Sequence, residues 1–218
     1  MIPKPVVSAP EAVQRVQDGM TILVPGFLDC GTPESLIDAL IAAGTSNLTA
    51  VCNDSAYPDR GIGKLIRHGR LRRFITTHQG TNPDMRNQTG GGTIEVELVP
   101  QGTLIERLRA GGAGLGGVLT PTGIGTPVEQ GKRKIEVNGR DYLLELPLRG
   151  DVALIRADVA DRAGNLIYRH TARNYNPVMA TAADWVIAEV GRIVEPGELD
   201  PDRAETPGLY VDVLVLRA

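Results

Sequence analysis

The stretch TILVPGFLDCGTPESLIDALIAAG, residues 21–44, decides the fold class. It opens with four apolar or β-branched residues, which are typical of a short buried strand. The segment Pro25–Gly31 then turns the chain, and Thr32 is a candidate N-cap, followed by a proline and a glutamate that suit the first turn of a helix. Apolar residues at helical spacing lead to Gly44, which suits a helix end. The stretch predicts a strand, a glycine turn and a helix in succession.

The alternation of strand-like and helix-like segments continues along the chain. Short apolar runs predict strands at 48–52, 74–77, 94–99, 152–157, 185–190 and 209–216, and amphipathic runs predict helices at 9–17, 62–68, 83–89, 104–109 and 177–183. Strands that alternate with helices form βαβ units, whose parallel strands are covered on both faces. The sequence therefore predicts an α/β fold with an open, mainly parallel sheet and helices on both faces.

A hairpin signal interrupts this alternation. Asn138-Gly139 lies between two strand-like runs, 134–137 and 142–145, and this dipeptide favours a type I′ turn because both central residues need a positive φ. We expect an inserted β-hairpin there. Since no linker, repeat or low-complexity tract divides the chain, residues 1–218 are expected to form a single domain.

The composition argues against several classes of function. Lys and Arg total 23 against 26 Asp and Glu, so the net charge of −3 leaves no basic excess for a nucleic-acid partner. No apolar run approaches the roughly 20 residues that span a bilayer, and the N-terminus has no secretory-signal pattern. Cys30 and Cys52 are too few for a disulfide framework and favour a reducing cytoplasm. The three histidines share no ligand spacing, so no metal site is expected.

Two segments at the ends of predicted strands are candidates for chemistry. Pro25–Gly31 would expose backbone N–H groups beside a helix N-terminus, where open α/β sheets bind ligands and the helix dipole favours anions. The alternative is a tight connection that binds nothing. The dipeptide Asn53-Asp54 follows the next predicted strand, where either the amide side chain donates to a developing oxyanion or the dipeptide forms an Asx turn.

Glycine gathers in the middle of the chain. Seven of the 26 glycines lie within residues 110–126. Such a segment has few side chains to bury, so it is either a mobile linker or a backbone surface that lies against a ligand or partner. Pro121 and several threonines stiffen it, which favours the second interpretation. Further on, Arg173 either clamps a carboxylate or phosphate or simply precedes the helix that starts near Asn176-Pro177.

Several short segments form a specific combination when taken in order. They are DGMT (18–21), GF (26–27), GTP (31–33), ND (53–54), VPQGTL (99–104), RAGGAG (109–114), TPTG (120–123) and ARNYNP (172–177). With these segments the chain resembles, along nearly its whole length, the α (A) subunit of the family I CoA-transferases, in the acetate or 3-oxoacid CoA-transferase group.

The resemblance implies a ping-pong transfer of CoA between carboxylic acids. In that family a glutamate attacks the acyl-CoA carbonyl, and an acyl-glutamyl anhydride leads to a covalent glutamyl-CoA thioester that the acceptor acid resolves. The glutamate belongs to the β subunit, so this chain is expected to be active only with a β subunit, commonly as α2β2. Its substrates would be a short-chain acyl-CoA or 3-oxoacyl-CoA and a carboxylic acid of the acetate or acetoacetate type, with no permanently bound cofactor.

The resemblance also assigns roles to residues. Asn53 and Gln101 match residues that stabilise the oxygen of the reacting carbonyl. Gly111, Gly112 and Gly114, with Arg173, are expected at the active site or subunit interface, the glycines in a loop. The CoA-binding segment would comprise Pro25, Gly26, Phe27, Leu28, Asp29, Cys30 and Gly31, in which Pro25 replaces the glycine usual in the family and removes one backbone N–H.

Two other interpretations stay open. The chain is either a related α subunit that serves 3-oxoadipate or a longer fatty acid, or, in a different class, a non-catalytic α/β module that binds a phosphate or nucleotide. The second alternative predicts a monomer that phosphate ligands saturate, whereas a transferase subunit gains stability from its β partner.

Overall fold

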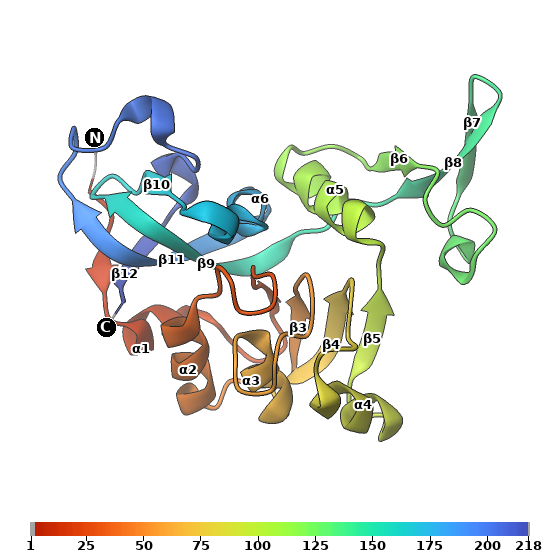
Figure 1. Ribbon diagram of the computed structural model, residues 1–218, viewed down its shortest axis with the longest axis horizontal. Helices are drawn as coiled ribbons and strands as arrows, with labels where there is room; N and C mark the ends of the chain where they lie inside the picture. Colours follow the sequence, from red (N-terminus) through yellow and green to blue (C-terminus); the bar gives the residue numbers. More distant parts are fainter. Residues whose placement is uncertain (1–2, 218) are drawn as a thin grey trace.

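A long, mainly parallel sheet organises the protein, whose computed structural model describes residues 3–217. Within these residues the sheet has nine strands, in the order β1-β12-β11-β9-β2-β3-β4-β5, with β10 beside β9 (Figure 1). All neighbouring strands are parallel except β9 and β10. The strands are β1 (Val6–Val7), β2 (Thr21–Leu23), β3 (Leu48–Val51), β4 (Leu71–Thr76), β5 (Glu95–Leu98), β9 (Gly150–Asp161), β10 (Leu166–Ile167), β11 (Ala183–Val194) and β12 (Val213–Leu216). The predicted sheet is confirmed; of the predicted domain 1–218, residues 1, 2 and 218 lie outside the described part.

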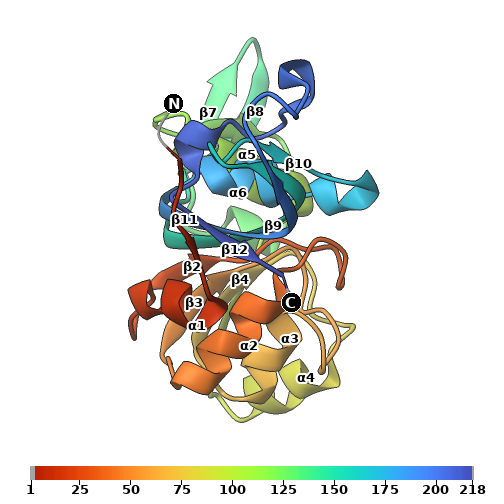
Figure 2. The same ribbon diagram turned by 90° about the vertical axis from the view of Figure 1, so that its left-hand side faces the viewer.

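Helices cover both faces of this sheet, as predicted. On one face lie α1 (Ala9–Ala12), α2 (Glu34–Ala43), α3 (Ile62–Arg67) and α4 (Pro83–Gly90), and on the other α5 (Gln101–Gly112) and α6 (Asn176–Thr181) (Figures 1 and 2). Among the helices of residues 3–217, none has both the length and the apolar character that crossing a bilayer requires.

Alternate residues of each strand build two separate cores. On β2, Ile22 packs into the core beneath α2 and α3, whereas Leu23 joins the core beneath α5 and α6. Leu154 and Ile155 divide in the same way on β9. Because successive side chains of a strand point to opposite faces and both faces are buried here, the strands read as continuous apolar runs in the sequence.

The start of α2 differs from the prediction, while its end agrees. Pro33 occupies the N-cap position in place of Thr32, and the helix begins at the next residue. The Thr32 hydroxyl is buried and has no hydrogen-bond partner among residues 3–217. Its side chain instead packs against Gly26 and Gly61, where an added Cβ would lie 2.5 and 2.9 Å from the nearest Thr32 atoms. Gly44 ends the helix at a φ of 79°, as expected of a C-terminal glycine.

The inserted hairpin is confirmed and belongs to a larger unit. Strands β7 (Lys134–Val137) and β8 (Arg140–Glu145) pair around Asn138 and Gly139, whose φ angles of 53° and 75° suit a type I′ turn. Strand β6 (Val118–Thr120) adds to the other edge of β8. The resulting three-stranded sheet is separate from the main sheet, and its hairpin projects from the body of the molecule (Figure 1).

The order in which strands are added to the main sheet reverses between β2 and β9, which are parallel neighbours. From β2 the chain moves outward through β3, β4 and β5, and then returns by way of α5 to β9, from which β11 and β12 build the other half. Open α/β sheets bind ligands at the carboxyl ends of the strands beside such a switch point. Strands β2 and β3 deliver their following segments to this edge, and the α5 N-terminus after β5 also reaches it.

Candidate active site

The segment Pro25–Gly31 forms a compact turn at the carboxyl end of β2. Phe27 and Cys30 exchange two backbone hydrogen bonds of 3.1 Å, which closes a loop around Leu28. Leu28 has a φ of 56°, a left-handed conformation that is uncommon outside glycine. The Phe27 side chain is 53% exposed. The turn therefore places an exposed aromatic ring and a strained backbone residue at the carboxyl edge of the sheet.

Side chains from the segment 171–176 hold this turn in place. Asn174 Nδ2 donates to the Cys30 carbonyl, and Asn176 Nδ2 donates to the Gly31 carbonyl, each at 2.9 Å. Gly31 has a φ of 81°, and an added Cβ would lie 2.9 Å from the Ala172 carbonyl oxygen. The glycine is thus required both by conformation and by the close approach of the second segment.

Arg173 belongs to the same segment but turns to a different partner. Its guanidinium forms an ion pair with Glu205. The structure therefore engages Arg173 within the chain, and its role as a clamp for a ligand carboxylate stays a prediction.

Asn53 and Gln101 meet at the sheet edge. Asn53 follows β3 and is 2% exposed, while Gln101 is the exposed first residue of α5. Gln101 Nε2 donates to Asn53 Oδ1 at 2.7 Å, and Asn53 Nδ2 donates to Asp54 Oδ2 at 2.8 Å. Forty-eight positions separate Asn53 from Gln101 in the sequence, and the fold places their amides in direct contact.

This amide pair retains hydrogen-bonding capacity. Each side-chain NH2 group has two N–H bonds and uses one of them in the contacts above. The second N–H of Asn53 and that of Gln101 have no partner among residues 3–217. Two preorganised amide donors at one edge are what a developing oxyanion requires.

Asp54 connects the amide pair to the turn. Its carboxylate accepts hydrogen bonds from the Leu28 N–H at 2.9 Å and from the Ala56 N–H at 2.8 Å, besides the Asn53 amide. The bond to the residue two positions on is an Asx turn. The Asx-turn alternative for Asn53-Asp54 is therefore correct for Asp54, and it leaves the amide oxygen of Asn53 directed toward Gln101.

Two buried groups lie beside these residues. Burial raises the pKa of the Cys52 thiol, and the nearby Asp54 carboxylate raises it further, so Cys52 is a neutral packed thiol rather than a nucleophile. Burial likewise raises the pKa of Tyr175, whose hydroxyl donates to the Gln101 carbonyl at 3.3 Å. Tyr175 thus holds the first turn of α5, which carries the Gln101 amide.

The prediction of a glycine loop at 111–112 is wrong. Gly111 and Gly112 are the last two residues of α5. An added Cβ at Gly111 would overlap the Leu148 carbonyl, and one at Gly112 would lie 2.8 Å from Thr181 Cβ on α6. These glycines let the helix pack closely against its neighbours. Gly114, with a φ of 68°, lies in the segment after the helix, as predicted.

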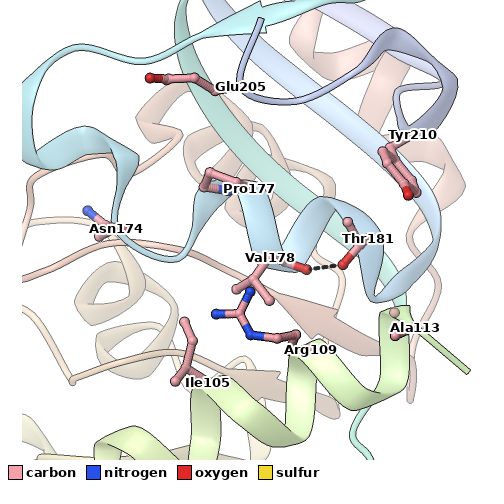
Figure 3. A pocket seen from close by; sticks show the side chains of 10 residues that line it. Ile105, Arg109, Ala113, Asn174, Pro177, Val178, Thr181, Glu205 and Tyr210 are labelled. Carbon is pink, nitrogen blue, oxygen red and sulfur yellow. Dashed lines mark hydrogen bonds between the residues drawn. The ribbon is translucent and has the colours of Figure 1, made fainter. Parts of the chain in front are cut away.

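A groove of about 390 Å³ runs between α5 and α6 (Figure 3). Figure 3 shows the Arg109 guanidinium of α5 below the Val178 side chain of α6, with Asn174 at one end and Tyr210 at the other. Asn174 also holds the turn, so the groove adjoins that segment. Asn53 and Gln101 do not line the groove; their amides lie at the opposite end of α5, at the sheet edge.

Sequence reasoning gave no role to Asn174 or Tyr175, named Asp54 only as part of a possible Asx turn, and gave Asn176 only the start of a helix. All four lie inside the segments that carry the resemblance, so their position was a signal. Their roles were hidden because each acts on a residue that is distant in sequence or on the backbone. No cluster of three His, Cys, Asp or Glu side chains that would suit a metal ion occurs within the described part of the chain.

Together these features define an α/β protein whose sheet edge offers side-chain amides and a strained turn to a carbonyl or anionic ligand. Residues 6–217 match the family model described as coenzyme A transferase. The chain belongs to the coenzyme A transferase family.

Named relatives and a solved structure resemble the chain over nearly its whole length. The acetoacetyl-CoA:acetate/butyrate CoA transferase alpha subunit of Clostridium acetobutylicum is 51% identical over 199 residues, which is 91% of each chain. The acetate CoA-transferase subunit alpha of Escherichia coli is 51% identical over 206 residues, which is 94% of each chain. An acyl-CoA transferase from E. coli O157:H7, solved as a thioester complex with CoA, has a TM-score of 0.86 and 26% identity. The match covers 99% of this chain and 47% of that one, so this chain spans about half of its length.

Proposed function

We propose that this chain is the α subunit of a heteromeric CoA-transferase that moves CoA between a short-chain acyl-CoA or 3-oxoacyl-CoA and a carboxylic acid of the acetate or acetoacetate type. The contact between the Asn53 and Gln101 amides carries the proposal. It supplies two N–H donors at one edge of the sheet, where the oxygen of a thioester carbonyl would gain negative charge during attack.

The chemistry consists of successive attacks on carbonyl carbons. A glutamate oxygen attacks the acyl-CoA carbonyl and the C–S bond breaks. This step releases the CoA thiolate and forms an acyl-glutamyl anhydride. The thiolate then attacks the glutamyl carbonyl, which releases the acyl group as a carboxylate and forms the glutamyl-CoA thioester. The acceptor acid reverses these steps. Each attack forms an oxyanion, and the free N–H groups of Asn53 and Gln101 would stabilise it.

The carboxylates of this edge are already engaged within the chain, which favours a nucleophile supplied by another chain. Asp54 already accepts three hydrogen bonds, and Asp29 in the turn pairs with Arg60 at 3.1 Å. Gln101 and Phe27 are exposed, which leaves the edge open for a second chain to cover. We place the nucleophilic glutamate on a β subunit, in an α2β2 assembly. A cytoplasmic location is supported by the two unpaired cysteines, Cys30 and Cys52.

Activity with and without the partner tests the two-chain claim. We expect the purified chain alone to show no exchange of CoA between acetoacetyl-CoA and acetate above background, and the complex with a co-expressed β subunit to show robust exchange. Efficient exchange by the chain alone would contradict the proposal, because the nucleophile would then lie within it.

The substitution Gln101→Ala tests the amide pair in the assembled complex. Loss of one oxyanion donor lowers kcat by roughly 10²-fold, with little change in the KM for acyl-CoA. Gln14→Ala, which changes an exposed glutamine after α1 on the other face of the sheet, is the matched control. An unchanged kcat for Gln101→Ala would remove this residue from the reaction.

Substrate comparison separates the alternatives. We expect kcat/KM to be higher for acetate or acetoacetate than for 3-oxoadipate or a longer fatty acid. Thermal unfolding of the chain with CoA, with sugar phosphates and with the β subunit tests the non-catalytic module. A large rise in Tm with sugar phosphates and none with the β subunit would favour that module.

A further inference from the structure

Asp54 is a buried carboxylate of the sheet edge that accepts three hydrogen bonds, and no step of the proposed reaction uses it. It is 4% exposed and lies one residue after Asn53. Its Oδ2 accepts from the Leu28 N–H and from the Asn53 amide, and its Oδ1 accepts from the Ala56 N–H. Three donors from two chain segments therefore converge on a single buried carboxylate.

Two of these donors belong to strained backbone. Leu28 and Ala56 have φ angles of 56° and 50°, although neither is a glycine or asparagine. The left-handed region places Cβ close to the following carbonyl oxygen, so such residues persist only where surrounding contacts hold them. The N–H groups of both residues point at the Asp54 carboxylate, which thereby supports both conformations.

The third donor sets the orientation of the amide pair. The Asp54 carboxylate accepts from all of its three partners, so the Asn53 NH2 group faces Asp54 and the Asn53 oxygen faces away from it. That oxygen in turn requires the NH2 group of Gln101 to face it. The carboxylate thus fixes which end of each amide donates, in a chain that runs from Asp54 through Asn53 to Gln101.

We propose that Asp54 is a positioning residue for the transferase reaction, which orients the Asn53 and Gln101 amides as donors and fastens the turn 25–31 to the end of β3. This inference rests on the proposed function of the amide pair. Asp54 acts on the reacting atoms only through Asn53 and Gln101, and on the bound CoA only through the turn.

A double-mutant cycle in the complex with the β subunit tests the inference. The variants are Asp54→Asn, Asn53→Ala and the two combined, with kcat and the KM for acyl-CoA measured separately. We expect Asn53→Ala to lower kcat by roughly 10²-fold and Asp54→Asn to lower it at least tenfold. The double variant should have a kcat within about threefold of Asn53→Ala alone, because Asp54 acts on catalysis through that amide.

The KM supplies an independent readout. Because the turn is fastened by Asp54 and not by Asn53, we expect Asp54→Asn to raise the KM for acyl-CoA severalfold in both backgrounds. Asp59→Asn, which changes an exposed aspartate five positions away, is the matched control and should alter neither constant. Asp54→Ser provides a second variant with a smaller polar side chain.

The outcomes separate the inference from the proposed function. If Asn53→Ala leaves kcat unchanged, the oxyanion role of the amide pair fails, and the inference fails with it. If Asn53→Ala lowers kcat but Asp54→Asn does not, only the positioning role of Asp54 is wrong. The same holds if the fold-loss of kcat in the double variant equals the product of the two single losses. If neither Asp54 variant assembles with the β subunit, the carboxylate serves folding, which also overturns the inference.

Discussion

Side chains distant in sequence satisfy the backbone of the turn that follows β2. Asn174 and Asn176 donate to two of its carbonyls, and Asp54 accepts from one of its N–H groups. A tight turn with a strained residue would otherwise leave several polar groups unpaired near the buried end of a strand. The conformation of the proposed CoA segment is therefore set from outside the segment.

This arrangement explains how much of the site the sequence could predict. The turn at Pro25–Gly31 was predictable because glycine and proline act locally. Asn53 was a candidate from its place after a predicted strand, and the resemblance added Gln101. Their contact was not predictable, because the hydrogen bond between them depends on the positions of β3 and α5 in the folded sheet. The role of Asp54 depends on the φ angles of Leu28 and Ala56, which no sequence pattern indicates.

Gly31→Ala tests the turn at the residue scale. An alanine at a left-handed φ is strained by about 1–2 kcal/mol, and here its Cβ would also meet the Ala172 backbone. Gly44→Ala is the matched control: its φ of 79° is similar, but an added Cβ has no described neighbour within 4 Å. We expect Gly31→Ala to lower the free energy of unfolding by at least about 1 kcal/mol more than Gly44→Ala. Equal losses in denaturant unfolding would contradict the close packing of the turn.

Among the elements, α5 connects the site to the rest of the molecule. It begins with Gln101 at the sheet edge and ends with two glycines packed on Leu148 and α6. Sequence reasoning placed the helix but ended it too early, because glycine usually stops a helix. Here packing outweighs that tendency.

The third strand of the small sheet, β6, was not predicted. It pairs with β8 across a long connection, whereas the hairpin is marked by a local dipeptide.

Gly111→Ala tests the packing of this helix. Alanine favours helix formation by up to about 1 kcal/mol over glycine, but at this position its Cβ would overlap the Leu148 carbonyl. We expect a net loss of roughly 1–3 kcal/mol in the free energy of unfolding. Gly102→Ala, in the first turn of the same helix, has no neighbour within 4 Å among residues 3–217 and should be neutral or stabilising. A stabilising Gly111→Ala would show that the helix end has room to move.

A second test at this scale concerns the charges that join β4, β5 and α5. Glu97 on β5 pairs with Arg107 of α5 at 2.8 Å and with Arg73 of β4 at 2.7 Å. Burial raises the pKa of Glu97, but the hydrogen bonds and charges of Arg107 and Arg73 outweigh it and lower the pKa overall. A lowered pKa in the folded state stabilises the protein above the unfolded pKa, and this contribution is lost as the pH falls through the folded pKa.

We therefore expect Glu97→Gln to be less stable than the unchanged protein by about 0.5–1 kcal/mol at pH 7, a modest value because the carboxylate is partly exposed. The difference should shrink as the pH falls below the ordinary pKa of a glutamate. Glu95→Gln, an exposed neighbour 3.5 Å from Arg73, should have a smaller effect. Urea unfolding at several pH values checks this, and a gap that stays constant down to pH 3 would contradict the ion-pair explanation.

At the scale of the whole molecule, the candidate site lies on an open edge of the main sheet. The amide donors and the strained turn lie beside the switch point of the sheet, and Phe27 and Gln101 are exposed there. The chain spans about half the length of the solved acyl-CoA transferase that it resembles. Fold class and family were predictable because the strand–helix alternation and the motif order extend along the whole chain. The exposed edge that we propose a second chain covers was not predictable, because exposure is a property of the folded sheet.

The location of the covalent intermediate tests whether the nucleophilic glutamate lies on the β subunit. The complex with the β subunit is incubated with acetoacetyl-CoA without an acceptor acid, and the intact mass of each chain is then measured. We predict that the β subunit gains the mass of CoA, less the water lost on thioester formation, and that this chain keeps its mass. A CoA adduct on this chain, with the β subunit unmodified, would show that the nucleophile lies in this chain.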